Sequence, residues 1–106
     1  MSDVFKAIAD PTRREILLML MEDANNIGQI AENFEMTRPA IAKHIKILQN
    51  AKLIAIEADH TDSRQRNCYV QLEALSEVQD YLALLEKFWK AKLKGLGTYL
   101  SKQKKT

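Results

Sequence analysis

The segment from Phe34 to Leu48 constrains the fold of this chain more than any other part of the sequence. Thr37 can accept a hydrogen bond from the free N–H groups at the start of a helix, and Pro39 suits the first turn, where its missing N–H costs nothing. Apolar residues then recur at intervals of four and three, which predicts a helix with one buried stripe. The stripe consists of Ile41, Ile45 and Leu48.

The remaining surface of this predicted helix is basic. Opposite the stripe and on its flanks lie Arg38, Pro39, Ala40, Lys43, His44 and Lys46. No carboxylate occurs between Glu35 and Glu57, although residues 1–71 hold 9 Lys and Arg against 10 Asp and Glu. A local positive patch on a charge-balanced scaffold attracts phosphates. The pattern favours a DNA recognition helix, and the alternative is an ordinary solvated helix face.

Capping signals predict shorter helices upstream. An apolar-faced helix is expected at residues 4–8, and Asp10 followed by Pro11 predicts the start of a second. Asn26 with Gln29 resembles a capping box, which opens a third short helix. Only a brief turn then separates this helix from Thr37, so the two are expected to cross at a wide angle. The sequence therefore predicts a helix-turn-helix over about residues 26–51.

Two β-rich runs follow, Leu53 to Glu57 and Asn67 to Gln71. The polar turn formers of residues 59–64 separate them, which predicts a hairpin over about residues 53–71. Because an isolated hairpin is marginally stable in water, this one must pack against the helices. The fold class is therefore mainly α with a small β-hairpin.

The final third predicts a long helix over about residues 73–101. Its apolar residues alternate steps of 3 and 4, a heptad-like seam made of Leu75, Val78, Leu82, Leu85 and Trp89. A small domain does not need so long an apolar helix, which favours a two-fold dimer over simple core packing. Gly95 and Gly97 weaken the helix by about 1 kcal/mol each relative to alanine, and the sequence leaves open whether the helix kinks or breaks there.

Length and composition exclude several classes of protein. A chain of 106 residues suggests a single domain, 1–106, and its longest apolar run is too short to span a bilayer. The N-terminus lacks the pattern of a secretory signal, and the single cysteine, Cys68, fits a reducing cytoplasm. No nucleophile–base pair, glycine-rich phosphate loop or paired-carboxylate motif is visible, so an enzyme is not expected.

Three motifs resemble one known family, the ArsR-type (arsenical-resistance repressor) transcription regulators. Ile8 to Leu17 resembles the opening motif of that family, and Thr37 to Leu48 resembles its recognition helix. Gln65, Arg66 and Tyr69 resemble the returning strand of its wing. The resemblance covers about residues 3–90 and implies a winged helix-turn-helix of order α-α-α-α-β-β-α, whose long C-terminal helix dimerises with the help of the first. It also implies an effector that releases DNA, often a metal ion.

The chain departs from the metal-sensing pattern of this family. It has no cysteine pair near the start of the recognition helix, and residues 72–106 contain no histidine. His44, His60 and Cys68 are not expected to converge on one metal ion. The resemblance is therefore to a non-metal-sensing branch, with no metal or other cofactor expected and with the effector unknown. Lys52 replaces the glycine usual after the recognition helix, so either the turn differs or Lys52 accepts backbone strain.

The residues expected to contact DNA have different roles. Arg38 is suited to reading a guanine edge, with phosphate contact as the alternative. Thr37, Pro39 and Ala40 lie at the helix entry, whereas Lys43 and Lys46 are suited to phosphate. His44 is equally suited to phosphate contact and to packing. Arg64 and Arg66 flank the wing and suit a narrow minor groove, phosphate or plain solvation.

The predicted dimer interface combines the first and last helices. Its residues are Val4, Phe5, Ile8, Val78, Leu82, Leu85 and Trp89. The sequence thus predicts a cytoplasmic homodimeric repressor that binds a palindromic operator in double-stranded DNA. The alternatives are a ligand- or redox-responsive winged-helix sensor, with Cys68 as a weak redox candidate, and a protein-interaction module that does not bind DNA.

Overall fold

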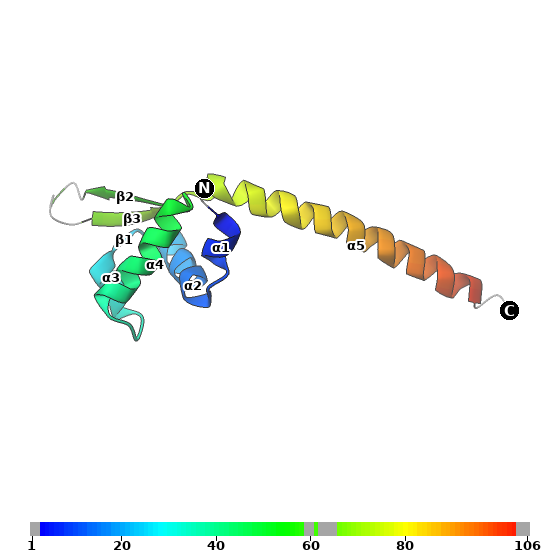
Figure 1. The fold of residues 1–106 in the computed structure, drawn as a ribbon, viewed down its shortest axis with the longest axis horizontal. Helices are drawn as coiled ribbons and strands as arrows, with labels where there is room; N and C mark the ends of the chain where they lie inside the picture. Colours follow the sequence, from blue (N-terminus) through cyan, green and yellow to red (C-terminus); the bar gives the residue numbers. More distant parts are fainter. Residues whose placement is uncertain (1–2, 59–60, 62–65, 104–106) are drawn as a thin grey trace. The chain divides into compact units, whose positions relative to one another are not determined.

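The computed structural model describes residues 3–58, 61 and 66–103, with side chains up to Gly97. The chain divides into two compact units, Met1–Ser76 and Glu77–Thr106. Helices and a small sheet build the first unit, and a single helix builds the second (Figure 1). The elements of the first unit are α1 (Val4–Ile8), α2 (Pro11–Glu22), β1 (Asn25–Asn26), α3 (Ile27–Glu32), α4 (Arg38–Asn50), β2 (Ile54–Ala58), β3 (Arg66–Val70) and the short 3₁₀ helix η1 (Leu72–Leu75).

Side-chain caps start α2, α3 and α4, as the sequence predicts. Asp10 accepts hydrogen bonds from the backbone N–H groups of Thr12 and Arg13 at 2.8 and 3.2 Å. Asn26 and Gln29 form the complete capping box, because each side chain accepts a hydrogen bond from the other's backbone N–H. These caps satisfy N–H groups that a helix start otherwise leaves unpaired.

The helix-turn-helix is confirmed, with α3 packed against α4. The predicted stripe of α4 is the buried one, since Ile41, Ile45 and Leu48 are at most 1% exposed. After α4, the backbone N–H of Leu53 donates to the carbonyl of Leu48 at 3.0 Å, and that of Lys52 donates to Gln49 at 2.9 Å. This pair of bonds is a Schellman motif, and it places Lys52 in the left-handed region with φ 63°. Of the two alternatives for this turn, the structure therefore shows the one in which Lys52 accepts backbone strain.

The predicted hairpin forms, but it belongs to a larger sheet. β2 and β3 pair antiparallel, with Ile54 opposite Val70 and Ile56 opposite Cys68. β1 adds to the other edge of β3, which gives the strand order β1-β3-β2. Neither β1 nor η1 is predicted by the sequence pattern. Two asparagines carry no alternating apolar pattern, so β1 had no signal of its own.

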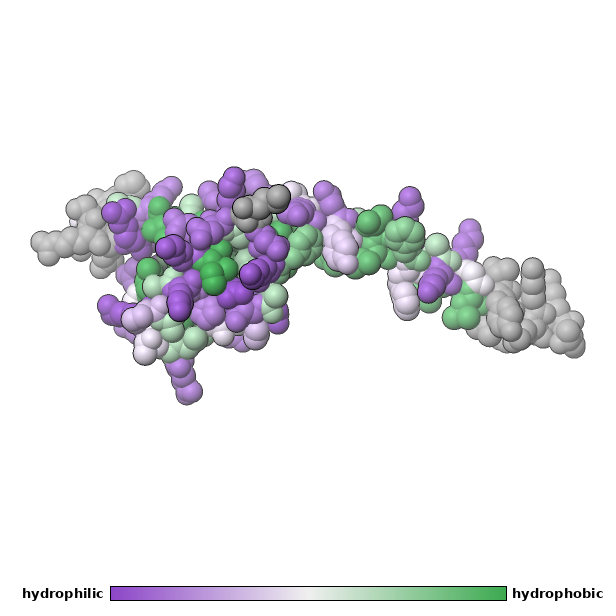
Figure 2. Space-filling view, in the orientation of Figure 1, coloured by the Kyte–Doolittle hydropathy of each residue, from purple (hydrophilic) through white to green (hydrophobic). Residues whose placement is uncertain are grey.

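The second unit consists of α5 (Ser76–Gln103). This helix is continuous past Gly95 and Gly97, so the break that the sequence left open does not occur. The low helix propensity of glycine costs about 1 kcal/mol of helix stability at each position, which is too little to end a long helix. Apolar side chains lie exposed along α5 (Figure 2). Among the described residues, no helix combines the length and apolar character needed to cross a membrane.

Candidate nucleic-acid interface

The start of α4 presents its backbone and first side chains to solvent. Thr37 caps the helix, because its Oγ1 accepts a hydrogen bond from the backbone N–H of Ala40 at 3.3 Å. Pro39 occupies the first turn, and no acidic residue lies there. Thr37 and Pro39 are exposed and Ala40 is half-buried. A helix N-terminus with free N–H groups and no carboxylate favours an anion.

Three cations project from the exposed side of α4. Arg38, Lys43 and Lys46 are all exposed; Lys43 and Lys46 lie opposite the buried stripe of the helix, and Arg38 lies on its flank. Within the part of the chain that the structure describes, none of them pairs with a carboxylate. Polar side chains dominate the face of the first unit drawn in Figure 2. These charges are therefore available for phosphate groups.

The guanidinium of Arg38 lies against the start of α3. A methyl carbon on Gly28 would stand 3.0 Å from Nη2 and 3.2 Å from Cζ of Arg38. Arg38 is therefore exposed to solvent yet rests on the preceding helix. The two helices of the helix-turn-helix meet at this residue.

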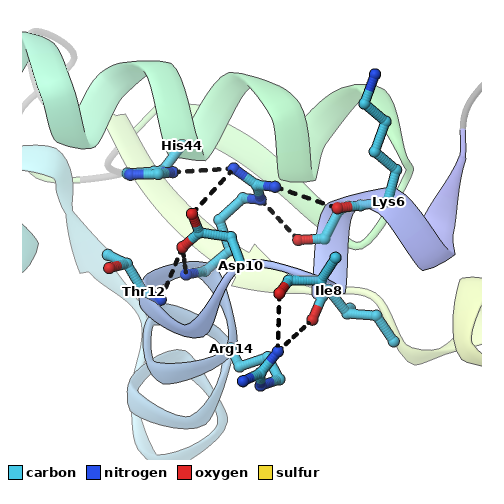
Figure 3. Close-up of polar contacts among 9 residues, drawn as sticks. Lys6, Ile8, Asp10, Thr12, Arg14 and His44 are labelled. Atoms are coloured by element: carbon cyan, nitrogen blue, oxygen red, sulfur yellow. Dashed lines mark hydrogen bonds and ion pairs between the residues drawn. The ribbon is translucent and has the colours of Figure 1, made fainter.

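His44 is held from inside the molecule by Arg13 of α2. The distance from Arg13 Nη1 to His44 Nδ1 is 3.2 Å, and His44 is half-buried (Figure 3). Because a guanidinium has only donors, Nδ1 accepts this bond, and a neutral His44 carries its proton on Nε2. The structure thus shows His44 in a packing role, and the Nε2–H remains a donor for an outside group.

Arg13 also joins α1 to α2. Its Nε and Nη2 donate to the carbonyls of Ala7 and Lys6 at 2.6 and 3.1 Å, and Nη1 lies 3.9 Å from Asp10 Oδ2 (Figure 3). The sequence analysis did not single out Arg13. Its contact with His44 spans 31 positions in the chain, so no local pattern reports it.

The pKa of the Asp10 carboxyl is lowered below its ordinary value of 3.8. Desolvation raises this pKa. The backbone N–H groups of Arg13 and Thr12 and the charge of Arg13 lower it further than desolvation raises it. Asp10 is therefore the anion that balances the guanidinium of Arg13 at the start of α2.

The wing contributes Arg66, which is exposed at the start of β3. Arg64 and His60 lie outside the described residues. Cys68 is fully buried in the middle of β3, and desolvation raises the pKa of its thiol from 9.0 to about 11. A thiol that is closed to solvent and held protonated is a poor redox sensor.

The residues predicted for a dimer interface are placed differently in the two units. Val4 is 3% exposed and packs in the core of the first unit, whereas Phe5 and Ile8 are half-buried. On α5, Val78 is half-buried. The other three seam residues are largely exposed, with Leu82 at 56%, Leu85 at 46% and Trp89 at 61%.

Comparison with known proteins agrees with this geometry. Residues 10–55 match the model of the family described as bacterial regulatory protein, arsR family. The transcriptional repressor SdpR of Bacillus subtilis is 47% identical over 55 residues, which are 52% of this chain and 61% of SdpR. The HTH-type transcriptional regulator Rv2034 of Mycobacterium tuberculosis is 36% identical over 50 residues, which are 47% of each chain. The matched part of this chain thus spans about three fifths of the length of SdpR and about half of the length of Rv2034.

A crystal structure of an ArsR family transcriptional regulator also resembles this chain. It superimposes with a TM-score of 0.71 at 31% identity and covers 81% of this chain and 86% of that one. The fold and the basic helix define a protein of the winged helix-turn-helix class. The chain belongs to the ArsR family of bacterial regulatory proteins.

Proposed function

We propose that this protein is a cytoplasmic transcriptional repressor that binds double-stranded DNA sequence-specifically as a homodimer, with α4 in the major groove. The observation that carries the proposal is the two-sided character of α4. One side is closed by Ile41, Ile45 and Leu48. Lys43 and Lys46 are exposed on the opposite side, and Arg38 is exposed on the flank. A major groove admits a helix of this kind, with base edges read near its N-terminus.

The exposed groups of α4 divide into reading and anchoring residues in this proposal. Arg38, at the first position of the helix, reads a base edge, because its planar fork can bond bidentately to guanine. Lys43 and Lys46 bind phosphate, and Thr37, Pro39 and Ala40 line the entry to the groove. His44 offers its Nε2–H to phosphate while Arg13 holds its other nitrogen. Arg66, with Arg64 beyond the described residues, carries the wing contact.

A salt titration tests whether the basic face binds DNA. The logarithm of the binding constant should fall with the logarithm of salt concentration at a slope of about −0.9 per phosphate contact. Lys43→Gln and Lys46→Gln should each reduce this slope by about 1. Lys87→Gln on α5 is the control and should leave it unchanged. A weak interaction with duplex DNA that responds to none of these lysines would favour a protein-interaction module instead.

The dimer rests on apolar surfaces that each unit leaves open. On α5 the seam residues Leu82, Leu85 and Trp89 are exposed. On the first unit Leu18 is 69% and Met21 54% exposed, beside an almost wholly apolar hollow of about 390 Å³ that Ile8 also lines. A second copy of the chain supplies matching apolar surface, and two-fold symmetry suits paired recognition helices about 34 Å apart on a palindromic operator.

The non-metal-sensing branch of the family is the second part of the proposal. In the described ranges no group of three or more His, Cys, Asp and Glu side chains is arranged to hold a metal ion. The positions of Cys68, buried in β3, and of His44, bonded to Arg13, support this proposal. The burial of Cys68 also counts against the redox-responsive alternative. A zinc titration that leaves DNA affinity unchanged is expected, and release of DNA by zinc would contradict it.

A further inference from the structure

Gly28 lies at the point where the side chain of Arg38 crosses the start of α3. A methyl carbon there would stand 3.0 Å from Arg38 Nη2, 3.2 Å from Arg38 Cζ and 3.3 Å from Asn26 Oδ1. These separations are tighter than ordinary van der Waals contact. The guanidinium therefore occupies space that the side chain of any other residue at position 28 would fill.

The backbone does not require glycine at this position. Gly28 is the second residue of α3, and in the described chain no glycine has a positive φ. Alanine would favour the helix more than glycine does. The space above the Cα atom, rather than the backbone conformation, therefore distinguishes glycine from other residues here.

The surface beneath Arg38 is well fixed. Asn26, the cap of α3, is held by the capping box, with Gln29 N donating to Asn26 Oδ1 at 2.8 Å and Asn26 N donating to Gln29 Oε1 at 3.1 Å. Asn26 also pairs with Asn67 of β3 in the sheet. A guanidinium resting on Gly28 beside this cap has fewer orientations than one projecting freely into solvent.

We propose that Gly28 is a positioning residue for sequence recognition, because it leaves room for the Arg38 guanidinium to be oriented before DNA arrives. The inference rests on the proposed function, in which Arg38 reads a base. Ordering a long side chain at an interface lowers affinity, and a side chain ordered in advance avoids that loss. The gain in affinity appears only on DNA where the orientation of the Arg38 guanidinium matters, which is a specific binding site.

A double-mutant cycle between Gly28→Ala and Arg38→Ala tests the proposal. Fluorescence anisotropy would measure the affinity of the full chain for a duplex selected by the wild-type protein from a random-sequence pool, and for the unselected pool. Gly28→Ala should lower the ratio of these affinities about 3- to 10-fold, with a melting temperature at or above that of the wild type. In the Arg38→Ala background the same change should leave the ratio unaltered.

Gly95→Ala is the matched control. It makes the same substitution within a helix, but a methyl carbon there meets nothing within 4 Å. It should leave the affinity ratio unchanged. A stability effect alone would act alike in both variants, so the control separates helix propensity from positioning.

The remaining outcomes contradict the inference. An unchanged ratio in Gly28→Ala, an equal loss on both DNAs, or the same loss with and without Arg38 would each overturn it while the proposed function stands. A wild-type chain that prefers no duplex over another would overturn the proposed function, and this inference with it.

Discussion

At the scale of single residues, Lys52 shows how a turn can override the preference of its residue. The Schellman motif needs a left-handed residue after α4, and Lys52 supplies it at φ 63°. For a residue with a Cβ atom this conformation costs about 1–2 kcal/mol. The buried side chains of Leu48 and Leu53, on either side of the turn, hold the motif in place. The local sequence alone could not predict the backbone conformation of Lys52, because the packing of Leu48 and Leu53 determines it rather than the conformational preference of lysine.

Replacing Lys52 by glycine should therefore stabilise the protein. Relief of strain, less the backbone entropy of glycine, predicts that Lys52→Gly raises the free energy of unfolding by about 0.5–1 kcal/mol. Urea denaturation followed by circular dichroism would measure it. Lys52→Ala removes the same charge but keeps the Cβ atom, so it should give no comparable gain. A gain of equal size in both variants would show that charge, not strain, is responsible.

Arg38 is the residue that we propose reads the DNA sequence. Arg38→Ala should flatten preference at one or two base positions by about 1–3 kcal/mol while the fold melts normally. Selection of bound fragments from a random pool, repeated with the variant, would locate those positions. Equal losses of affinity on specific and random DNA would instead assign Arg38 to phosphate.

At the scale of elements, the helices were predictable wherever a cap and an apolar period agree. Asp10, Asn26 and Thr37 each start a helix as the sequence predicts. Features that depend on distant partners could not be predicted in this way. β1 exists because β3 pairs with it, and the contact between Arg13 and His44 exists because α2 and α4 pack together. Neither leaves a local pattern in the sequence.

The cap of α2 gives a pH-dependent prediction. The pKa of Asp10 is lowered in the folded state, so its contribution to stability is complete above the unfolded value of 3.8 and is lost as pH falls through the folded value. The stability difference between wild type and Asp10→Ala should stay constant from neutral pH to about pH 5 and shrink on further acidification. Thermal melts across this pH range would measure it.

Asp10→Asn provides the control for this prediction. Asparagine keeps an oxygen that can accept the N–H bonds of Thr12 and Arg13, but it carries no charge. Its stability relative to Asp10→Ala should therefore not vary with pH. If the two variants lost stability equally at neutral pH, the charge of Asp10 rather than the cap geometry would be the main contribution.

At the scale of the whole molecule, the dimer that we propose through α5 would allow two recognition helices to act together. Leu85→Asp should break the dimer, because each copy loses about 1.5–3 kcal/mol of apolar burial and places a carboxylate in the seam. The dissociation constant should rise by about two orders of magnitude or more, and binding to a palindromic duplex should weaken with it. Sedimentation equilibrium would measure the first effect.

Leu84→Asp is the matched control for the dimer. Leu84 is 50% exposed, close to the 46% of Leu85, but it lies on the opposite side of α5 from the seam. This variant should remain dimeric. Trp89, the single tryptophan of the chain, gives a second measurement, since its emission should shift to longer wavelength only when the seam opens. A dimeric, DNA-competent Leu85→Asp protein would show that the seam is not the interface.

The short strand β1 has a mechanical consequence. Asn26 pairs with Asn67, one residue from the connection that joins the two hairpin strands, and Asn26 also caps α3, so the hairpin and the helix-turn-helix share one residue. A displacement of β3 should therefore be transmitted to α3, the helix that contacts Arg38. Changes in the length of the connection from Ala58 to Arg66 should therefore alter how far the hairpin reaches along a duplex, while the angle at which α4 enters the groove is preserved.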